Sequence, residues 1–169
     1  MDNRDMAVDV QLTEGDIGTL QKYIGDIKYP NVYVEIGTAS GGSALVARAA
    51  AKEDVEVYTI DVINDLRGKA IDAKGINFIQ GASVEVAKTW DVSRKIGVLF
   101  IDGDHNMAKQ DFLAWEQYLT DDAVVVFHDY AVHSPQVVQD CDELFNNNLN
   151  YKILFTPDAS PARNGDTSM

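Results

Sequence analysis

The sequence predicts an α/β fold, with a doubly wound, mostly parallel sheet that carries helices on both faces. Segments of strand character alternate with segments of helical spacing along the chain, as in βαβ units with right-handed crossovers. Two segments, 96–101 and 123–127, are apolar on both faces, as central parallel strands are expected to be. A glycine-rich turn, 37–42, joins the first strand directly to a helix.

The first helix is expected over 13–27, because apolar residues recur there at helical spacing and Thr13 and Asp16 resemble a capping box. Pro30 ends this helix and leads into the first strand. Strands and helices then alternate as far as residue 155, with a polar connection at 62–75. We expect strands at 32–36, 55–60, 76–79, 96–101, 123–127 and 151–155, and helices at 43–52, 84–90, 107–119 and 135–146.

Composition predicts one globular domain over residues 1–169, with 1–11 flexible, a core over 13–156 and a loop-like tail at 157–169. The formal net charge of -13 disfavours nucleic acid and anionic membranes as partners, and suits a neutral or cationic small ligand or a divalent metal. Cys141 is the single cysteine, which excludes an internal disulfide. Neither a secretory signal nor an apolar run of membrane length is visible, so we expect a cytoplasmic protein.

Each of the first five expected strands ends in residues that could bind a ligand. Because the carboxyl ends of parallel strands lie at one edge of a sheet, these residues are expected to form a single site. In chain order they are the glycine turn with Ser43, then Asp61, then Gly81 to Ser83, then Asp102 with His105, and finally His128 with Asp129.

The glycine turn is suited to binding a cofactor. Gly37, Gly41 and Gly42 let a ligand approach backbone amides at a helix N-terminus, where the helix dipole favours an anionic group. Glu35 adds an acceptor, and Asp61, 20 residues after Gly41, could accept both hydroxyls of a ribose. The spacing differs from the G-x-G-x-x-G fingerprint, which disfavours NAD. A turn without a ligand, and an Asp61 that only caps a helix or turn, stay open as alternatives.

Five motifs, in this order, resemble the class I S-adenosylmethionine-dependent O-methyltransferases. The most similar group includes macrocin O-methyltransferase and the cephalosporin-hydroxylase-like proteins, and catechol O-methyltransferase is a more distant relative. The resemblance covers about residues 13–156. The motifs are V-E-I-G-T-A-S-G-G-S-A at 34–44, T-I-D at 59–61, Q-G-A-S at 80–83, L-F-I-D-G-D-H at 99–105 and F-H-D-Y at 127–130.

The resemblance implies a Rossmann-like methyltransferase fold that binds S-adenosylmethionine and a divalent metal. Residues of the glycine turn would surround the methionine part of the cofactor, Asp61 would bind its ribose, and Ala82 and Ser83 would line its adenine. The implied metal ligands are Asp102, His128 and Asp129, and His105 matches the position of the general base. The implied cofactor-binding set is Glu35, Gly37, Thr38, Ala39, Gly41, Ser43, Asp61, Val62, Gly81, Ala82, Ser83 and Asp102.

The residue types agree with a metal-assisted reaction. Asp102 and Asp129 offer the oxygen ligands that Mg²⁺ prefers, whereas His128 is a softer ligand and admits Mn²⁺. A divalent metal lowers the pKa of a bound hydroxyl, and His105, three residues after Asp102, could take up its proton near neutral pH. The alternatives are a structural turn after Asp102, a His128 bonded to backbone and a His105 that only belongs to a turn.

The function expected from the sequence is a divalent-metal-assisted O-methyltransferase acting on a small hydroxylated metabolite. The alternatives are a non-catalytic protein that binds S-adenosylmethionine or S-adenosylhomocysteine, and a hydroxylase-like enzyme on the same scaffold. Family members usually carry a seventh strand in a C-terminal hairpin, but only 13 residues follow Thr156 here. The seventh strand is therefore expected to be absent, short or supplied by a partner chain, which makes a homodimer possible.

Overall fold

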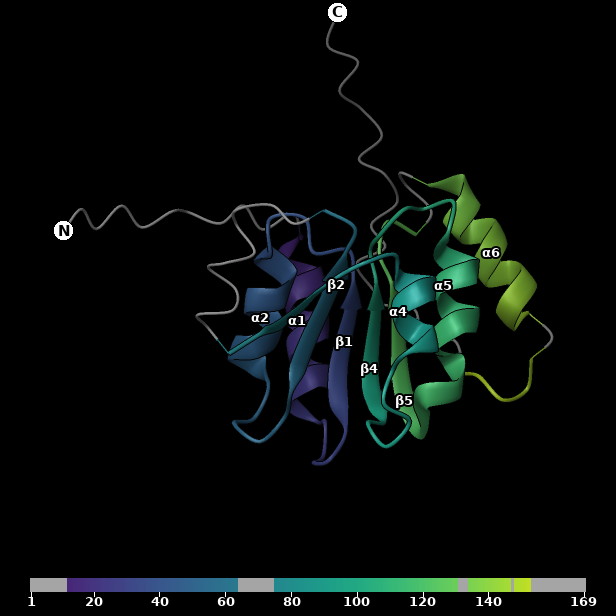
Figure 1. Ribbon diagram of the computed structural model, residues 1–169. Helices are drawn as coiled ribbons and strands as arrows, with labels where there is room; N and C mark the ends of the chain where they lie inside the picture. The colour runs from purple at the N-terminus through teal and green to yellow at the C-terminus, as the bar shows by residue number, and fades with distance from the viewer. Residues whose placement is uncertain (1–11, 64–74, 131–133, 147, 153–169) are drawn as a thin grey trace, which may run out of the picture.

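The computed structural model describes residues 12–63, 75–130, 134–146 and 148–152, and its five strands form one sheet (Figure 1). All neighbouring strands are parallel, in the order β3-β2-β1-β4-β5, so the chain winds outward from the centre in both directions. This confirms the predicted doubly wound α/β fold. The strands are β1 (Val32–Ile36), β2 (Val57–Asp61), β3 (Asn77–Gln80), β4 (Ile96–Ile101) and β5 (Leu119–Phe127).

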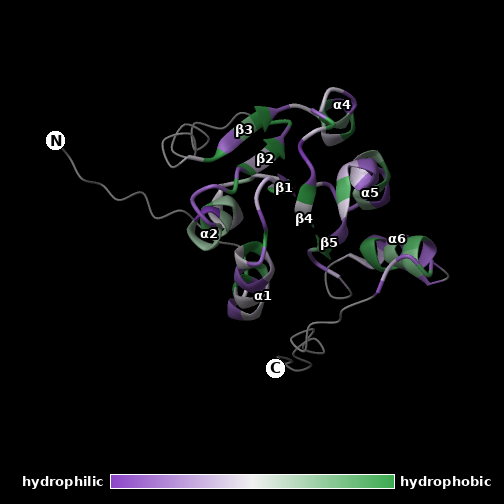
Figure 2. Cartoon of the chain, turned by 90° about the horizontal axis from the view of Figure 1, so that it is seen from below, coloured by the Kyte–Doolittle hydropathy of each residue, from purple (hydrophilic) through white to green (hydrophobic). Residues whose placement is uncertain are grey.

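Helices cover both faces of the sheet, and Figure 2 shows the strands lying between the two helix layers. One layer holds α1 (Glu14–Gly25) and α2 (Gly42–Ala50), which pack against each other. The other layer holds α4 (Ser83–Lys88), α5 (Ala108–Trp115) and α6 (Pro135–Phe145), with α5 in the middle.

Alternate side chains of each strand enter opposite apolar cores, because successive strand residues point to opposite faces. Tyr33 packs in the core that contains Leu20 and Ile24 of α1. Val34, the next residue, packs in the core that contains Trp115 of α5. The sheet is therefore packed on both faces by apolar side chains.

The predicted capping box at the start of α1 is confirmed. The Thr13 hydroxyl oxygen accepts a hydrogen bond from the Asp16 backbone N–H at 3.2 Å. In return the Asp16 carboxylate accepts from the Thr13 backbone N–H at 2.9 Å. The two residues satisfy donors that a helix N-terminus leaves without intrahelical partners.

The predicted helix over 107–119 is wrong at its end. α5 stops at Trp115, residues Glu116–Tyr118 form a 3-10 turn, and Leu119 already belongs to β5. The Tyr118 hydroxyl donates to the Ala87 carbonyl at 2.7 Å, which ties this turn to α4. Ile96 pairs with Leu119 but Val98 pairs with Val124, so extra β5 residues stand between two paired stretches. Residues 121–122 of this strand are exposed acids, so the hydropathy of the sequence does not indicate a strand there.

Smaller differences concern other boundaries. β2 starts at Val57 rather than at residue 55, because the Val55 amide closes a turn onto the Lys52 carbonyl at 3.1 Å. Tyr151 and Lys152 lie outside any strand, and the rest of the predicted strand at 151–155 falls outside the described residues, as do 1–11 and 157–169. In the part of the chain that the structure describes, no helix has the length and apolar character needed to cross a membrane.

Candidate active site

The first position of the turn between β1 and α2 has a backbone conformation and close surroundings that only glycine can accommodate. Gly37 has a φ of +95°, and a Cβ added there would lie 2.2 Å from the carbonyl oxygen of Asp102. Gly41, at the N-cap of α2, also has a positive φ, of +81°. The turn therefore brings backbone against the end of β4 and leaves no room for a larger residue at Gly37.

A small cavity opens beside this turn. Its lining includes five of the predicted cofactor residues and Gly42 of the predicted glycine turn, together with two residues that the sequence did not single out, Leu12 and Ser40. Leu12 precedes α1, so the start of the N-terminal helix forms part of the wall. The complete lining is Leu12, Gly37, Thr38, Ala39, Ser40, Gly42, Ser43 and Asp102.

Asp61, at the end of β2, holds the glycine turn in place. One carboxylate oxygen accepts hydrogen bonds from the backbone amides of Thr38 and Ala39, each at 3.0 Å. The other accepts from the Ile63 amide at 2.9 Å. A carboxylate oxygen has two lone pairs, so these contacts leave acceptor capacity for a ligand hydroxyl. Asp61 thus lies beside the turn as predicted, and it also holds the backbone of the turn in place.

Glu35 lies fully buried beneath the N-terminus of α2. Burial raises the pKa of its carboxyl from 4.5 to about 7, although hydrogen bonds from Thr59, Tyr33 and Ser43 act to lower it. The Thr59 hydroxyl donates at 2.8 Å and the Tyr33 hydroxyl at 3.0 Å. Ser43 lines the cavity, so its hydroxyl connects this buried carboxyl with the cavity wall.

The predicted adenine-side residues lie at the ends of β2 and β3, outside the lining of the cavity. Val62 is exposed, and the Gly81 amide donates to the Asp61 carbonyl at 2.8 Å. Ala82 is exposed at the N-cap of α4. The Ser83 hydroxyl accepts a hydrogen bond from the Trp115 indole at 2.8 Å and is directed into the α4–α5 interface.

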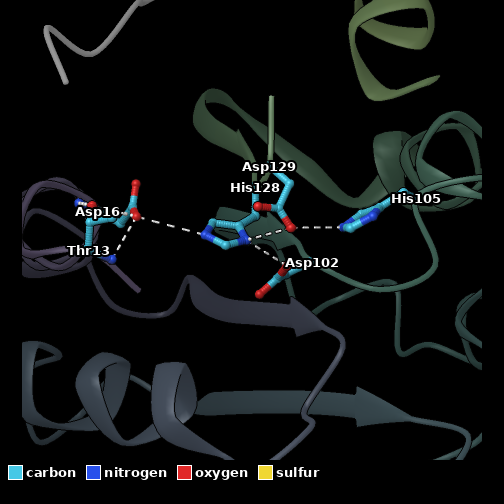
Figure 3. A network of polar contacts seen from close by, with 6 residues as sticks. All are labelled: Thr13, Asp16, Asp102, His105, His128 and Asp129. Atoms are coloured by element: carbon cyan, nitrogen blue, oxygen red, sulfur yellow. Dashed lines mark hydrogen bonds and ion pairs between the residues drawn. The ribbon is translucent and has the colours of Figure 1, made fainter. Parts of the chain in front are cut away.

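An acid–histidine cluster stands at the ends of β4 and β5, where Figure 3 shows its side chains pointing toward one another. His128 Nδ1 lies 2.9 Å from Asp102 Oδ1 and 3.4 Å from Asp129 Oδ2. His105 Nε2 lies 3.1 Å from Asp129 Oδ2. The prediction that these four residues converge is confirmed. In the described contacts the His128 ring faces carboxylates rather than backbone.

Carboxylates on several sides control the charge of His128. Burial alone would lower the pKa of the imidazole, but the hydrogen bond and charge of Asp102 and the charges of Asp129 and Asp16 outweigh it, and the pKa rises to about 9. The third of these acids comes from α1, where Asp16 Oδ2 lies 3.8 Å from His128 Nε2. Sequence reasoning recognised Asp16 as a capping residue and missed this contact, which no local spacing could reveal.

The donor set of the cluster fits a divalent metal. Asp102, His128 and Asp129 each offer one ligand atom, and these atoms lie within 4.8 Å of one another. Neighbouring ligands around an ion with bonds of about 2.1 Å stand about 3 Å apart, close to the two nitrogen–oxygen distances in the cluster. Mg²⁺ prefers ligands that are all oxygen atoms, so two carboxylates and one imidazole suit it less well. The same three ligands also suit Mn²⁺. His128 would have to lose its Nδ1 proton to serve as a ligand.

Fold and site together define a class I S-adenosylmethionine-dependent methyltransferase. The sheet order, the glycine turn and the strand-end acid beside it are those of the predicted class. Residues 34–130, more than half of the chain, match a family described as a methyltransferase domain, and the chain belongs to that family. The matched range contains both the glycine turn and the acid–histidine cluster.

Solved structures show the same fold at low sequence identity. CalS11, a TDP-rhamnose 3'-O-methyltransferase of calicheamicin biosynthesis, is 16% identical with a TM-score of 0.69, over 86% of this chain and 74% of CalS11. TomG, an O-methyltransferase from Streptomyces achromogenes in complex with SAM, is 16% identical with a TM-score of 0.63, over 82% of this chain and 69% of TomG. MycE, solved with Mg and SAH, is 17% identical with a TM-score of 0.53, over 66% of this chain and 31% of MycE.

Proposed function

We propose that the protein transfers the methyl group of S-adenosylmethionine to a hydroxyl of a small metabolite, with help from a divalent metal at Asp102, His128 and Asp129. The observation that carries this proposal is the double position of Asp102. It lines the cavity beside the glycine turn, and its carboxylate contacts His128 in the acid–histidine cluster. A cofactor in the cavity and an acceptor at the cluster would therefore meet at this residue.

In this proposal S-adenosylmethionine and the divalent ion have separate chemical roles. S-adenosylmethionine supplies a methyl group on a sulfonium, and a divalent ion supplies Lewis acidity that favours loss of a hydroxyl proton. His105 takes up that proton as the acceptor oxygen bonds to the methyl carbon and the carbon–sulfur bond breaks. With its Nε2 directed at Asp129, His105 presents Nδ1 as the proton acceptor, and Asp129 fixes the orientation of the ring.

Charge and the fold neighbours support the acceptor class and the metal. A site built from several acids suits a cationic cofactor and a divalent ion, and the net charge of -13 argues for a small-molecule acceptor over nucleic acid. By its name CalS11 acts on a TDP-linked sugar, and MycE was solved with Mg. A hydroxylated metabolite such as a sugar is accordingly the acceptor class that we propose.

The test is methyl transfer to a panel of sugars, sugar nucleotides and phenols, followed through release of S-adenosylhomocysteine. His105→Ala should lower turnover by about 10²–10⁴-fold, the usual effect of removing a positioned base. Asn106→Ala is the matched control in the same turn, because the described hydrogen bond of its side chain goes to Asp104 Oδ1 at 3.0 Å and not to the cluster.

The outcomes separate the candidate functions. Equal rates for wild type and His105→Ala would remove His105 from the mechanism. A wild type that binds S-adenosylhomocysteine but methylates no acceptor on the panel would favour the non-catalytic binding protein instead. Activity that persists after removal of all divalent metal with a chelator would contradict the metal-assisted step.

A further inference from the structure

We infer that Asp16, on the N-terminal helix, is a positioning residue that orients His128 so that its Nδ1 faces the metal. The inference rests on the proposed metal at Asp102, His128 and Asp129. It assigns a role in the site to a residue of α1, outside the carboxyl edge of the sheet from which the other site residues come.

The two ring nitrogens of His128 face different carboxylates. Nδ1 lies 2.9 Å from Asp102 and 3.4 Å from Asp129, whereas Nε2 lies 3.8 Å from Asp16 Oδ2 (Figure 3). Only Nδ1 is therefore directed at the other proposed ligands. A histidine that binds metal through one nitrogen commonly presents the N–H of the other to a carboxylate, which fixes both the tautomer and the ring orientation.

The Asp16 carboxylate is held in place by its own helix. The oxygen that faces His128, Oδ2, also accepts from the Thr13 backbone N–H at 2.9 Å and from the Thr13 hydroxyl at 2.7 Å. A side chain held by two hydrogen bonds loses little further entropy when it acts on a neighbour. The capping box thus aims a fixed negative charge at the far side of the imidazole.

A distance of 3.8 Å exceeds a direct hydrogen bond, so Asp16 acts on His128 through its charge. A negative charge beside Nε2 attracts that edge of the ring, and so holds Nδ1 toward Asp102 and Asp129. The side chain of His128 is 16% exposed and that of Asp16 is 39% exposed, so solvent screens the attraction mainly on the Asp16 side. Leu12, which lines the cavity, stands just before α1, so the N-terminal segment that includes Asp16 adjoins both the cavity and the cluster.

The experiment measures Mn²⁺ affinity by titration calorimetry in the full chain, in the presence of S-adenosylhomocysteine. Asp16→Asn keeps the shape of the side chain and removes its charge, and we expect it to weaken Mn²⁺ binding about 10–100-fold. Glu14→Gln is the matched control, since Glu14 is the other acid in the first turn of α1 and the described contacts do not join it to His128, so its Mn²⁺ affinity should stay close to wild type. Asp16→Glu, which supplies the usual acid of a capping box, should restore most of the affinity.

A second measurement determines which ring nitrogen of His128 carries a proton. In wild-type protein with ¹⁵N-labelled histidine and saturating Mg²⁺, we expect the His128 proton on Nε2, with Nδ1 unprotonated. A proton on Nδ1 in the metal-loaded protein would overturn the inference. This readout does not depend on whether Asp16→Asn folds well.

The outcomes distinguish this inference from the proposed function on which it rests. If wild type binds neither Mn²⁺ nor Mg²⁺, the metal-assisted reaction and the inference both fail. If wild type binds Mn²⁺ and Asp16→Asn binds it equally well, only the role of Asp16 is refuted. If Glu14→Gln loses as much affinity as Asp16→Asn, the effect comes from the general negative charge of the helix N-terminus and Asp16 has no separate role.

Discussion

The cofactor side and the metal side of this site are built by different means. On the cofactor side the shape comes from backbone, through a positive φ at Gly37 and amides held by Asp61. On the metal side the shape comes from charged side chains, which meet around His128 from β4, β5 and α1. The cofactor side should therefore be intolerant of added side-chain volume, and the metal side should be sensitive to changes of charge.

Asp102 belongs to both regions and shows how closely they adjoin. Its backbone carbonyl fills the space that a side chain at Gly37 would need, and its carboxylate contacts His128. A change in the turn should therefore reach the cluster through the backbone of β4. A change of charge at His128 or Asp129 should have less effect on the turn, because neither residue lines the cavity.

The largest effect is expected from Gly37→Ala. A Cβ at 2.2 Å from the Asp102 oxygen and a φ of +95° combine overlap with backbone strain, which together should cost about 3–5 kcal/mol in the free energy of unfolding. Binding of S-adenosylhomocysteine should be lost as well. Urea unfolding and calorimetry measure the two effects.

Gly18→Ala is the control for Gly37→Ala. Gly18 lies within α1, and a Cβ added there meets nothing within 4 Å. It should stabilise the protein by about 0.5–1 kcal/mol, because alanine is the better helix former. Similar stabilities for the two variants would contradict the claim that backbone shape defines the cofactor side.

The next largest effect concerns Glu35 and pH. Since burial raises the pKa of this carboxyl from 4.5 to about 7, the folded state holds the proton more tightly, and stability is lost as pH rises through 7. The difference between a pKa of 4.5 in the unfolded chain and about 7 in the folded protein corresponds to about 3 kcal/mol in the free energy of unfolding. Glu35→Gln cannot ionise, so the stability of wild type relative to Glu35→Gln should fall by about this amount between pH 4.5 and pH 8.

Urea unfolding of wild type and Glu35→Gln across this pH range provides the measurement. The comparison cancels the titration of groups that both proteins share. Parallel pH profiles would show that the carboxyl is not protonated in the folded protein near neutral pH.

A smaller effect is expected from Asp61→Ala. Loss of a charged acceptor for the ribose should weaken S-adenosylhomocysteine binding by about 1.5–3 kcal/mol, measured by calorimetry. Asp91→Ala is a suitable control, because Asp91 makes a similar contact to a backbone amide, that of Ser93 at 3.0 Å, in the loop before β4. Unchanged affinity in a folded Asp61→Ala protein would place the ribose elsewhere and leave Asp61 with its structural task alone.

The sequence was sufficient to predict which distant residues lie close together where strand topology alone brings them together. Asp61, Asp102 and His128 follow strands that run parallel, so their convergence required only the correct strand assignment. The class of fold, five strand cores and the capping box of α1 were likewise predictable, since each depends on local pattern.

Details that depend on packing between elements were not predictable. The early start of β5 depends on pairing with Ile96, and the orientation of the Ser83 hydroxyl depends on the Trp115 indole beside it. The approach of Asp16 to His128 depends on how α1 packs across the sheet. Such contacts join residues far apart in sequence, and no periodicity or spacing encodes them.

We propose that a cofactor pocket and a metal cluster adjoin at Asp102 but bind their ligands separably. Titration calorimetry with S-adenosylhomocysteine and Mn²⁺ on wild type and Asp129→Asn tests it most directly. Asparagine tolerates the φ of +54° at this position, so the variant removes charge with little strain. We predict that Asp129→Asn binds S-adenosylhomocysteine as wild type does and no longer binds Mn²⁺. Loss of both ligands in a folded variant, or Mn²⁺ binding equal to that of wild type, would contradict the account.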